Sequence, residues 1–125
     1  MKYMMFVVVD PAAAAEAMPS EQDLTIEEWV ADVDGRGKRL AGDALRPVSE
    51  ATTVRVSRGE VLITDGPFTE SKEWIAGFDI LECDDLDEAI QIASRHPQAN
   101  GGKLELRPFW TDEDWRKAAE GTEKG

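Results

Sequence analysis

The segment Tyr3–Val9 is apolar at every position and constrains the fold more than any other part of the sequence. It has the length of a strand and ends in three β-branched valines, so it predicts a buried β-strand. Successive residues of a strand point to opposite faces, and both faces are apolar here, so we expect both to be covered. A signal peptide is the less favoured interpretation, because Asp10-Pro11 interrupts the run at the short limit for such a segment.

Two amphipathic helices are predicted further along the chain. Thr25 and Glu28 form a capping box, and the apolar stripe after them predicts a helix that extends to Gly42. Gly35 and Gly37 fall inside it and leave a kink, an early stop or a close helix–sheet contact as alternatives. The other expected elements are a connection at 10–19, an extended link at 45–47, strands at 52–57, 61–64, 74–82 and 103–109, a helix between Asp85 and Pro97, and a short helix from Thr111 with a frayed end.

The order β-α-β-β-β-α-β predicts an α+β fold. It corresponds to a ferredoxin-like split βαβ plan with an extra hairpin strand, in which the helices pack on one face of an antiparallel sheet. The second apolar face of the first strand then needs a partner, and a twofold homodimer with sheet against sheet would supply it. Residues 1–110 are expected to form the domain, and residues 111–125 a short C-terminal helix and tail.

Charge and cysteine content narrow the partners and the compartment. The chain has 125 residues with 14 Lys and Arg against 26 Asp and Glu, a net charge of -12. This charge argues against direct binding of nucleic acid or of an anionic membrane. The single cysteine, Cys83, suits a reducing cytoplasm. No segment approaches the roughly 20 apolar residues that span a bilayer, and no metal-ligand spacing or cofactor motif is present.

A distinctive motif lies between the third and fourth predicted strands. It reads Asp65-Gly66-Pro67-Phe68-Thr69-Glu70-Ser71-Lys72-Glu73 and is followed by Gly77-Phe78. Over residues 1–110 the sequence resembles the DGPF branch of the YCII-related family. Flanking residues that fit this resemblance are Leu45 with Pro47 and the runs 51–55, 84–89 and 105–108.

The resemblance implies a ferredoxin-like fold that pairs into a dimeric α/β barrel with a cleft. It implies no settled activity: some relatives resemble small lyases or dehydrochlorinases that use a His–Asp pair, and DGPF members are associated with extracytoplasmic-function sigma factors. This sequence departs from the family in two places. No histidine lies near the first helix, because His96 is the only one, and Asp79 stands where many DGPF relatives have an aromatic residue.

Two carboxylates are the candidate catalytic residues. Asp65 ends a strand at a turn, where it could act as a general base or simply cap the turn. Asp79 is an acid among apolar strand neighbours, so it must be paired, exposed or functional. Arg107 could pair with Asp79 or with Asp10 across the sheet, and Arg55 is a second possible partner. Such a pair would be a buried ion pair, and the functional alternative is a clamp for a substrate carboxylate.

The candidate ligand-binding residues are Asp10, Gly66, Pro67, Phe68, Lys72, Glu73 and Arg107. Lys72 among its acidic neighbours could hold an anionic ligand at a cleft rim, or the cluster could be a solvated loop. His96 ends a helix, where the helix dipole alone favours it, and a catalytic role is the less favoured alternative. Trp110 and Trp115 are expected to pack the C-terminal segment or to form an exposed patch.

Three functions follow as hypotheses. The leading one is a small cytoplasmic homodimer with a ligand-binding cleft, acting as a regulatory accessory in sigma-factor control. The alternative is a lyase or isomerase that acts on a small organic acid through carboxylate acid/base residues and Arg107. The third is a protein-binding partner, for example of a sigma factor, that uses an exposed apolar patch.

Overall fold

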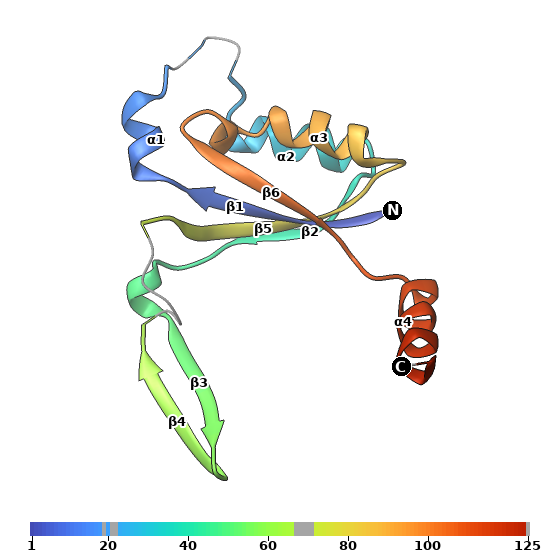
Figure 1. Cartoon of the computed structure of the whole chain (residues 1–125). Helices are drawn as coiled ribbons and strands as arrows, with labels where there is room; N and C mark the ends of the chain where they lie inside the picture. Colours follow the sequence, from blue (N-terminus) through green and yellow to red (C-terminus); the bar gives the residue numbers. More distant parts are fainter. Residues whose placement is uncertain (19, 21–22, 67–71, 125) are drawn as a thin grey trace.

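The computed structural model describes residues 1–18, 20, 23–66 and 72–124. At its centre is a four-stranded antiparallel sheet with the order β2-β5-β1-β6, and a separate antiparallel hairpin pairs β3 with β4. Helices α2 and α3 cover one face of the central sheet (Figure 1). The elements are β1 (Lys2–Val9), α1 (Pro11–Glu16), α2 (Ile26–Gly35), β2 (Arg39–Ala44), η1 (Val48–Glu50), β3 (Thr52–Ser57), β4 (Glu60–Asp65), β5 (Trp74–Glu82), α3 (Leu86–Ser94), η2 (Pro97–Ala99), β6 (Gly102–Pro108) and α4 (Asp112–Lys124).

This arrangement is α+β, as the sequence predicted. Strands β1, β2, β5 and β6 with helices α2 and α3 follow a βαββαβ order, which is consistent with a ferredoxin-like fold. The hairpin β3–β4 is inserted between β2 and β5 and lies outside the central sheet. The hairpin of residues 52–64 was therefore predicted correctly, whereas its place outside the central sheet and the edge strand β2 were not.

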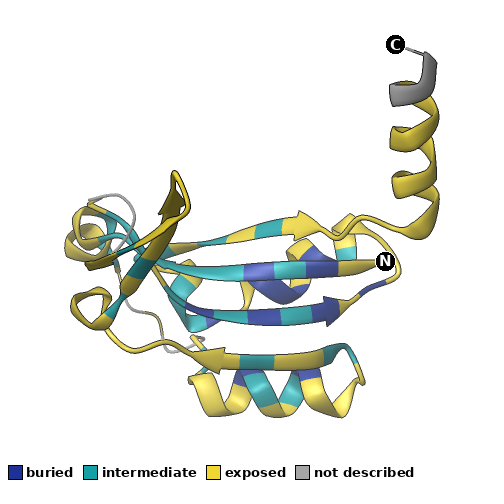
Figure 2. Ribbon diagram, turned by 90° about the horizontal axis from the view of Figure 1, so that it is seen from below, coloured by how far each residue is buried: buried dark blue, intermediate teal, exposed yellow. Residues whose placement is uncertain are grey.

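Strand β1 lies inside the sheet, as its apolar sequence predicts. It pairs with β5 on one side and with β6 on the other. Tyr3 and Met5 belong to the core beneath the helices and are 2% and 0% exposed. Met4 and Phe6 point to the opposite face, where they are only half-buried. The prediction of a strand with two apolar faces is confirmed, and none of the described helices covers the second face (Figures 1 and 2).

The core lies between the sheet and helices α2 and α3. Trp29 of α2 is fully buried, and its indole Nε1 donates a 2.9 Å hydrogen bond to the carbonyl of Ile92 in α3. Thr25 caps α2 through the predicted capping box, and Asp85 caps α3. The other buried apolar residues are Tyr3, Met5, Val33, Leu81, Cys83, Ala89 and Ala93.

The first long helix is shorter than the sequence indicated. Helix α2 ends at Gly35, so the prediction that it continues to Gly42 is wrong. Gly37 has a φ of +70°, the left-handed conformation that ends helices, and the early stop is the correct alternative. Residues Arg39–Ala44 instead form the edge strand β2 by pairing with β5. No residue of this strand is β-branched or aromatic, so its conformation depends on its partner strand.

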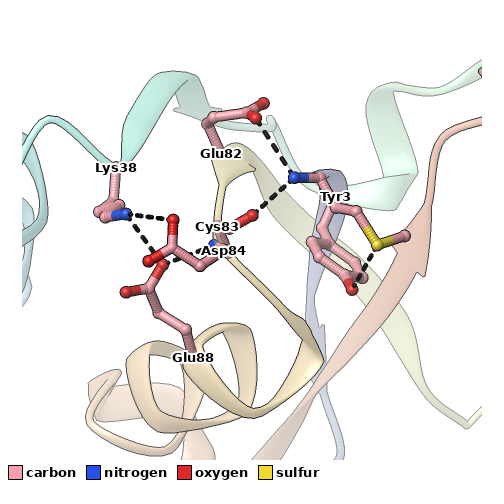
Figure 3. A network of polar contacts seen from close by, with 7 residues as sticks. Tyr3, Lys38, Glu82, Cys83, Asp84 and Glu88 are labelled. Carbon is pink, nitrogen blue, oxygen red and sulfur yellow. Dashed lines mark hydrogen bonds and ion pairs between the residues drawn. The ribbon is translucent and has the colours of Figure 1, made fainter.

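A cluster of charges joins the start of β2 to the start of α3 (Figure 3). Lys38 Nζ lies 3.0 Å from the carboxylate of Glu88 and 3.5 Å from that of Asp84. The backbone N–H of Asp84 and the side chain of Lys38 hydrogen-bond to Glu88 and lower the pKa of its carboxyl. Cys83 is buried next to this cluster, and burial raises the pKa of its thiol, as expected for an unreactive cysteine.

The hairpin β3–β4 and helix α4 project on the side of the sheet opposite α2 and α3 (Figure 1). Four apolar residues share one face of the hairpin, where Val54 stands opposite Ile63 and Val56 opposite Val61. These side chains are 60–66% exposed. Helix α4 continues to Lys124, beyond the predicted start of the frayed end. The central sheet stays open in the described chain, and no described helix is long and apolar enough to cross a membrane.

Candidate functional site

A cavity of about 370 Å³ lies on the helix-covered side of the sheet, bordered by α2, β2, β5 and η2. We call it the Asp79 cavity. Its volume lies at the lower end of the range of small-molecule sites. The polar side chains on its wall include Arg39, Asp79 and His96, and the apolar wall includes Val7, Ile26 and Val30.

Asp79 on β5 and Arg39 on β2 form an ion pair at the wall of the Asp79 cavity. Nε of Arg39 donates a 2.7 Å hydrogen bond to Asp79 Oδ1. Arg39 also donates from Nη2 to the carbonyl of Gly42 at 3.1 Å, and its Nη1 lies 3.4 Å from Asp34 Oδ1. Asp79 is only 6% exposed. The interpretation of Asp79 as half of a buried ion pair is therefore confirmed, with a partner that the sequence did not indicate.

Gly42 leaves the space that this ion pair occupies. The strand register places Gly42 opposite Asp79 on neighbouring strands. A Cβ atom at position 42 would overlap Asp79 Oδ1 and crowd Arg39 Nη2. The sequence indicated Gly42 as the end of a helix. In the structure it is a residue of β2, and its missing side chain makes room for the Arg39–Asp79 ion pair.

The Asp79 carboxyl has an altered affinity for protons. Burial raises its pKa above the usual value, although the hydrogen bond and the charge of Arg39 act in the opposite direction. Among the described residues, none donates a hydrogen bond to Asp79 Oδ2. A carboxylate with a raised pKa and a free oxygen can accept a proton or a hydrogen bond from a bound molecule.

His96 borders the same cavity and is 6% exposed. Its Nδ1 accepts a 2.9 Å hydrogen bond from the backbone N–H of Gln98, so the neutral ring carries its proton on Nε2. Burial lowers the pKa of His96 to about 4, which keeps the ring neutral at pH 7. The ring packs edge-on against Trp29, with ring centroids 4.7 Å apart. The sequence favoured a helix-dipole contact for His96 over a catalytic role and did not indicate its place at the cavity.

The predicted residues Asp65 and Gly66 are not among the described residues that border the Asp79 cavity. Asp65 is exposed at the end of β4. Gly66 has a φ of +104°, donates its N–H to the carbonyl of Ala51 at 2.7 Å and accepts a 2.8 Å hydrogen bond from Thr53 Oγ1. These contacts close the base of the hairpin. Of the other ligand-binding candidates in this segment, Pro67 and Phe68 lie outside the described residues and Lys72 is exposed.

Asp10 and Glu73, both predicted to bind ligand, come together elsewhere. Asp10 caps α1 by accepting hydrogen bonds from the N–H groups of Ala12 and Ala13 at 3.1 and 3.3 Å. Lys103 on β6 lies 2.6 Å from Glu73 and 3.9 Å from Asp10. The backbone N–H of Ala13, helped by Glu73 and Lys103, lowers the pKa of Asp10. Lys103 offsets one of the two carboxylate charges, and the three groups do not border the Asp79 cavity.

Arg107 lies on the face of the sheet opposite Asp79. On β6 it pairs with Met4 of β1, whereas Asp79 pairs with the next residue, Met5. Neighbouring residues of a strand point to opposite faces, so the expected pairing of Arg107 with Asp79 is wrong. Arg55 is exposed on the hairpin and is not the partner either.

Comparisons with known proteins give one family and one curated relative. The YCII-related domain matches residues 1–115. "Uncharacterized protein R00369" of Rhizobium meliloti (strain 1021) is 44% identical over 67 residues, which are 52% of this chain and 54% of that protein. The match thus spans about half the length of this relative.

Proposed function

Because this chain belongs to the YCII-related domain family, we propose that it is a cytoplasmic homodimer whose Asp79 cavity binds a small organic ligand. One observation carries the proposal. A buried carboxylate and a neutral imidazole border an apolar cavity, and the described residues leave Asp79 Oδ2 and His96 Nε2 without a hydrogen bond. Neither atom is enclosed without a partner among the described residues, so both are open to a ligand or water that enters the cavity. The resemblance of residues 65–73 to the DGPF branch extends the proposal to a regulatory accessory role beside a sigma factor.

A second candidate function is an enzyme of the lyase or isomerase type. It is favoured by the raised pKa of Asp79, because a general base works best when its pKa lies near the working pH. His96 Nε2, with its proton, would then donate a hydrogen bond to the substrate. In this candidate Asp79 takes the catalytic role, and Asp65, exposed at the hairpin, takes none.

The ligand proposal is tested by closing the cavity from its rim. Ala44 and Ala41 are both exposed alanines on β2, but only Ala44 borders the Asp79 cavity. We expect a small-molecule library, screened by ligand-observed NMR, to yield binders of the wild-type protein. Ala44→Phe should weaken these binders at least tenfold, while Ala41→Phe should retain them. A screen without binders, or equal binding by Ala44→Phe, would contradict the proposal.

The homodimer is proposed because the open sheet face and the hairpin face are both apolar. Met4 and Phe6 stand opposite Ile80 and Phe78 on the open face, and all four are half-buried in the single chain. Two such faces packed together, with the hairpin of one copy lying against the other, would form the dimeric α/β barrel that the DGPF resemblance implies.

Light scattering at micromolar concentration should therefore give twice the chain mass of 13.8 kDa. Ile63→Asp places a charge on the apolar hairpin face and should weaken the dimer at least tenfold, because a buried unpaired charge is costly. Thr64→Asp, on the other hairpin face, is the matched control and should leave the mass unchanged. A wild-type mass of 13.8 kDa would refute the dimer.

A further inference from the structure

We propose that the ligand of the Asp79 cavity is an uncharged or cationic hydrogen-bond donor with an apolar body, an alcohol or an amine, and not a carboxylate or phosphate anion. The inference rests on the ligand-binding function proposed above and names the chemical class of that ligand. It replaces the carboxylate clamp that the sequence suggested for Asp79 and its arginine.

The guanidinium of Arg39 is already engaged by the protein. Arginine recognises anions through two parallel N–H donors that form a fork. Here Nε is bonded to Asp79 at 2.7 Å and Nη2 to the carbonyl of Gly42 at 3.1 Å, while Nη1 lies 3.4 Å from Asp34. Each of the three nitrogens has an acceptor in the protein, so only the second N–H groups of Nη1 and Nη2 are left for an incoming carboxylate.

The charge around the cavity is negative. Arg39 is matched by two carboxylates, Asp79 and Asp34. His96 adds no positive charge at pH 7 because its pKa is about 4. Like charges repel one another, so the excess of carboxylates on this wall disfavours the binding of anions.

The two unpaired polar atoms define what the ligand must offer. Asp79 Oδ2 can only accept a hydrogen bond while the carboxyl is ionised, and His96 Nε2–H can only donate one. A hydroxyl group serves both, since its O–H donates and its oxygen accepts. An amine also donates a hydrogen bond to Asp79, and its positive charge is attracted to the carboxylate. Val7, Ile26 and Val30 provide the apolar contact for the body of the molecule.

The test uses probes that share a body and differ in the polar group. Benzyl alcohol, benzylamine and benzoate form one set, and isobutanol, isobutylamine and isobutyrate form a second. We expect the alcohol or the amine of each set to bind the wild-type protein at least tenfold more tightly than the carboxylate, measured by NMR titration of the His96 ring signals. Carboxylates that bind equally or more tightly would overturn the inference while the ligand-binding function stands. If the small-molecule library also yields no binder, the proposed ligand-binding function fails as well. If the library yields only anionic binders, the ligand-binding function stands and only the inference about the ligand class is overturned.

A charge-removing variant separates electrostatics from shape. Asp34 is exposed and pairs with Arg39 Nη1, so Asp34→Asn should fold normally. Because it removes one of the two carboxylates that offset the charge of Arg39, it should raise the affinity for benzoate at least threefold while that for benzyl alcohol stays constant. Asp87→Asn makes the same change of charge on α3, away from the cavity, and should alter neither affinity. Equal effects of the two variants would show that the discrimination does not arise from the wall of the cavity.

Discussion

Arg39→Met is expected to lower the free energy of unfolding by about 3 kcal/mol at pH 8, because it leaves the buried carboxylate of Asp79 without its partner. This is the lower end of the usual range, since Asp79 borders a cavity that water can enter. Loss of Arg39 also removes the interactions that oppose the raised pKa of Asp79, so the pKa should rise further. A raised native-state pKa gives stability that is present at low pH and is lost as the pH rises through it. The loss should therefore be smaller at pH 5 than at pH 8.

Urea unfolding at the two pH values measures this loss. Arg55→Met removes an exposed arginine from the hairpin and should change stability by less than about 0.5 kcal/mol. The double variant Arg39→Met/Asp79→Leu removes both charges and should recover most of the loss, because apolar replacements of a buried ion pair are often neutral or stabilising. A loss in Arg39→Met that is equal at both pH values, or that the double variant fails to recover, would show that Asp79 is not the cause.

The stability of the wild-type protein is expected to fall by about 3 kcal/mol between pH 6.5 and pH 4 through His96 alone. The native ring titrates near pH 4 and the unfolded ring near its ordinary value of 6.5. Between these values the unfolded chain binds a proton that the native chain does not, so acid favours unfolding. The contribution is present above pH 6.5 and is lost as the pH falls toward 4.

His96→Asn isolates this contribution. The Asn side-chain oxygen can accept the Gln98 N–H in place of Nδ1, since Asn is an effective capping residue, but it does not titrate. We expect the variant to be less stable at neutral pH, because it loses the packing against Trp29, and to lose less stability on acidification. The raised pKa of Asp79 acts in the opposite direction, but it is common to both proteins and cancels in the difference. Parallel stability profiles of the two proteins would contradict the buried neutral state of His96.

The sequence was a good guide wherever an element carries its own local signal. The β-branched run of β1, the capping box at Thr25 and the Asp85 cap of α3 each predicted an element that the structure contains. Strand β2 has no such signal, because Arg39–Ala44 contains alanine, glycine and charged residues that acquire a strand conformation only by pairing with β5. Intrinsic strand propensity therefore does not predict a strand whose conformation depends on hydrogen bonds to its neighbour.

The site was harder to predict than the fold for the same reason. Asp79 could be identified, since a single acid among apolar strand residues needs an explanation in any fold. Its partner Arg39 could not, because it lay within a stretch that the sequence placed in a helix. The preference for Arg107 assumed that the two residues share a sheet face, and only the register of β1 with β5 and β6 decides that. His96 next to Pro97 offered a weak signal, since a histidine at that step can cap the turn that follows.

The segment 45–73 leaves the sheet and returns to it between two strands that are already neighbours. The N–H of Leu45 donates to the carbonyl of Ala76 at 2.8 Å, so the chain departs and re-enters at the same place. Antiparallel neighbours can be joined by a two-residue turn, and none of the described buried core residues comes from this segment. Evolution can therefore lengthen, shorten or exchange the segment while the core and the Arg39–Asp79 pair persist. The motif of residues 65–73, which carries the resemblance to the DGPF branch, lies in this segment, so the pairing of the sheet strands does not depend on it.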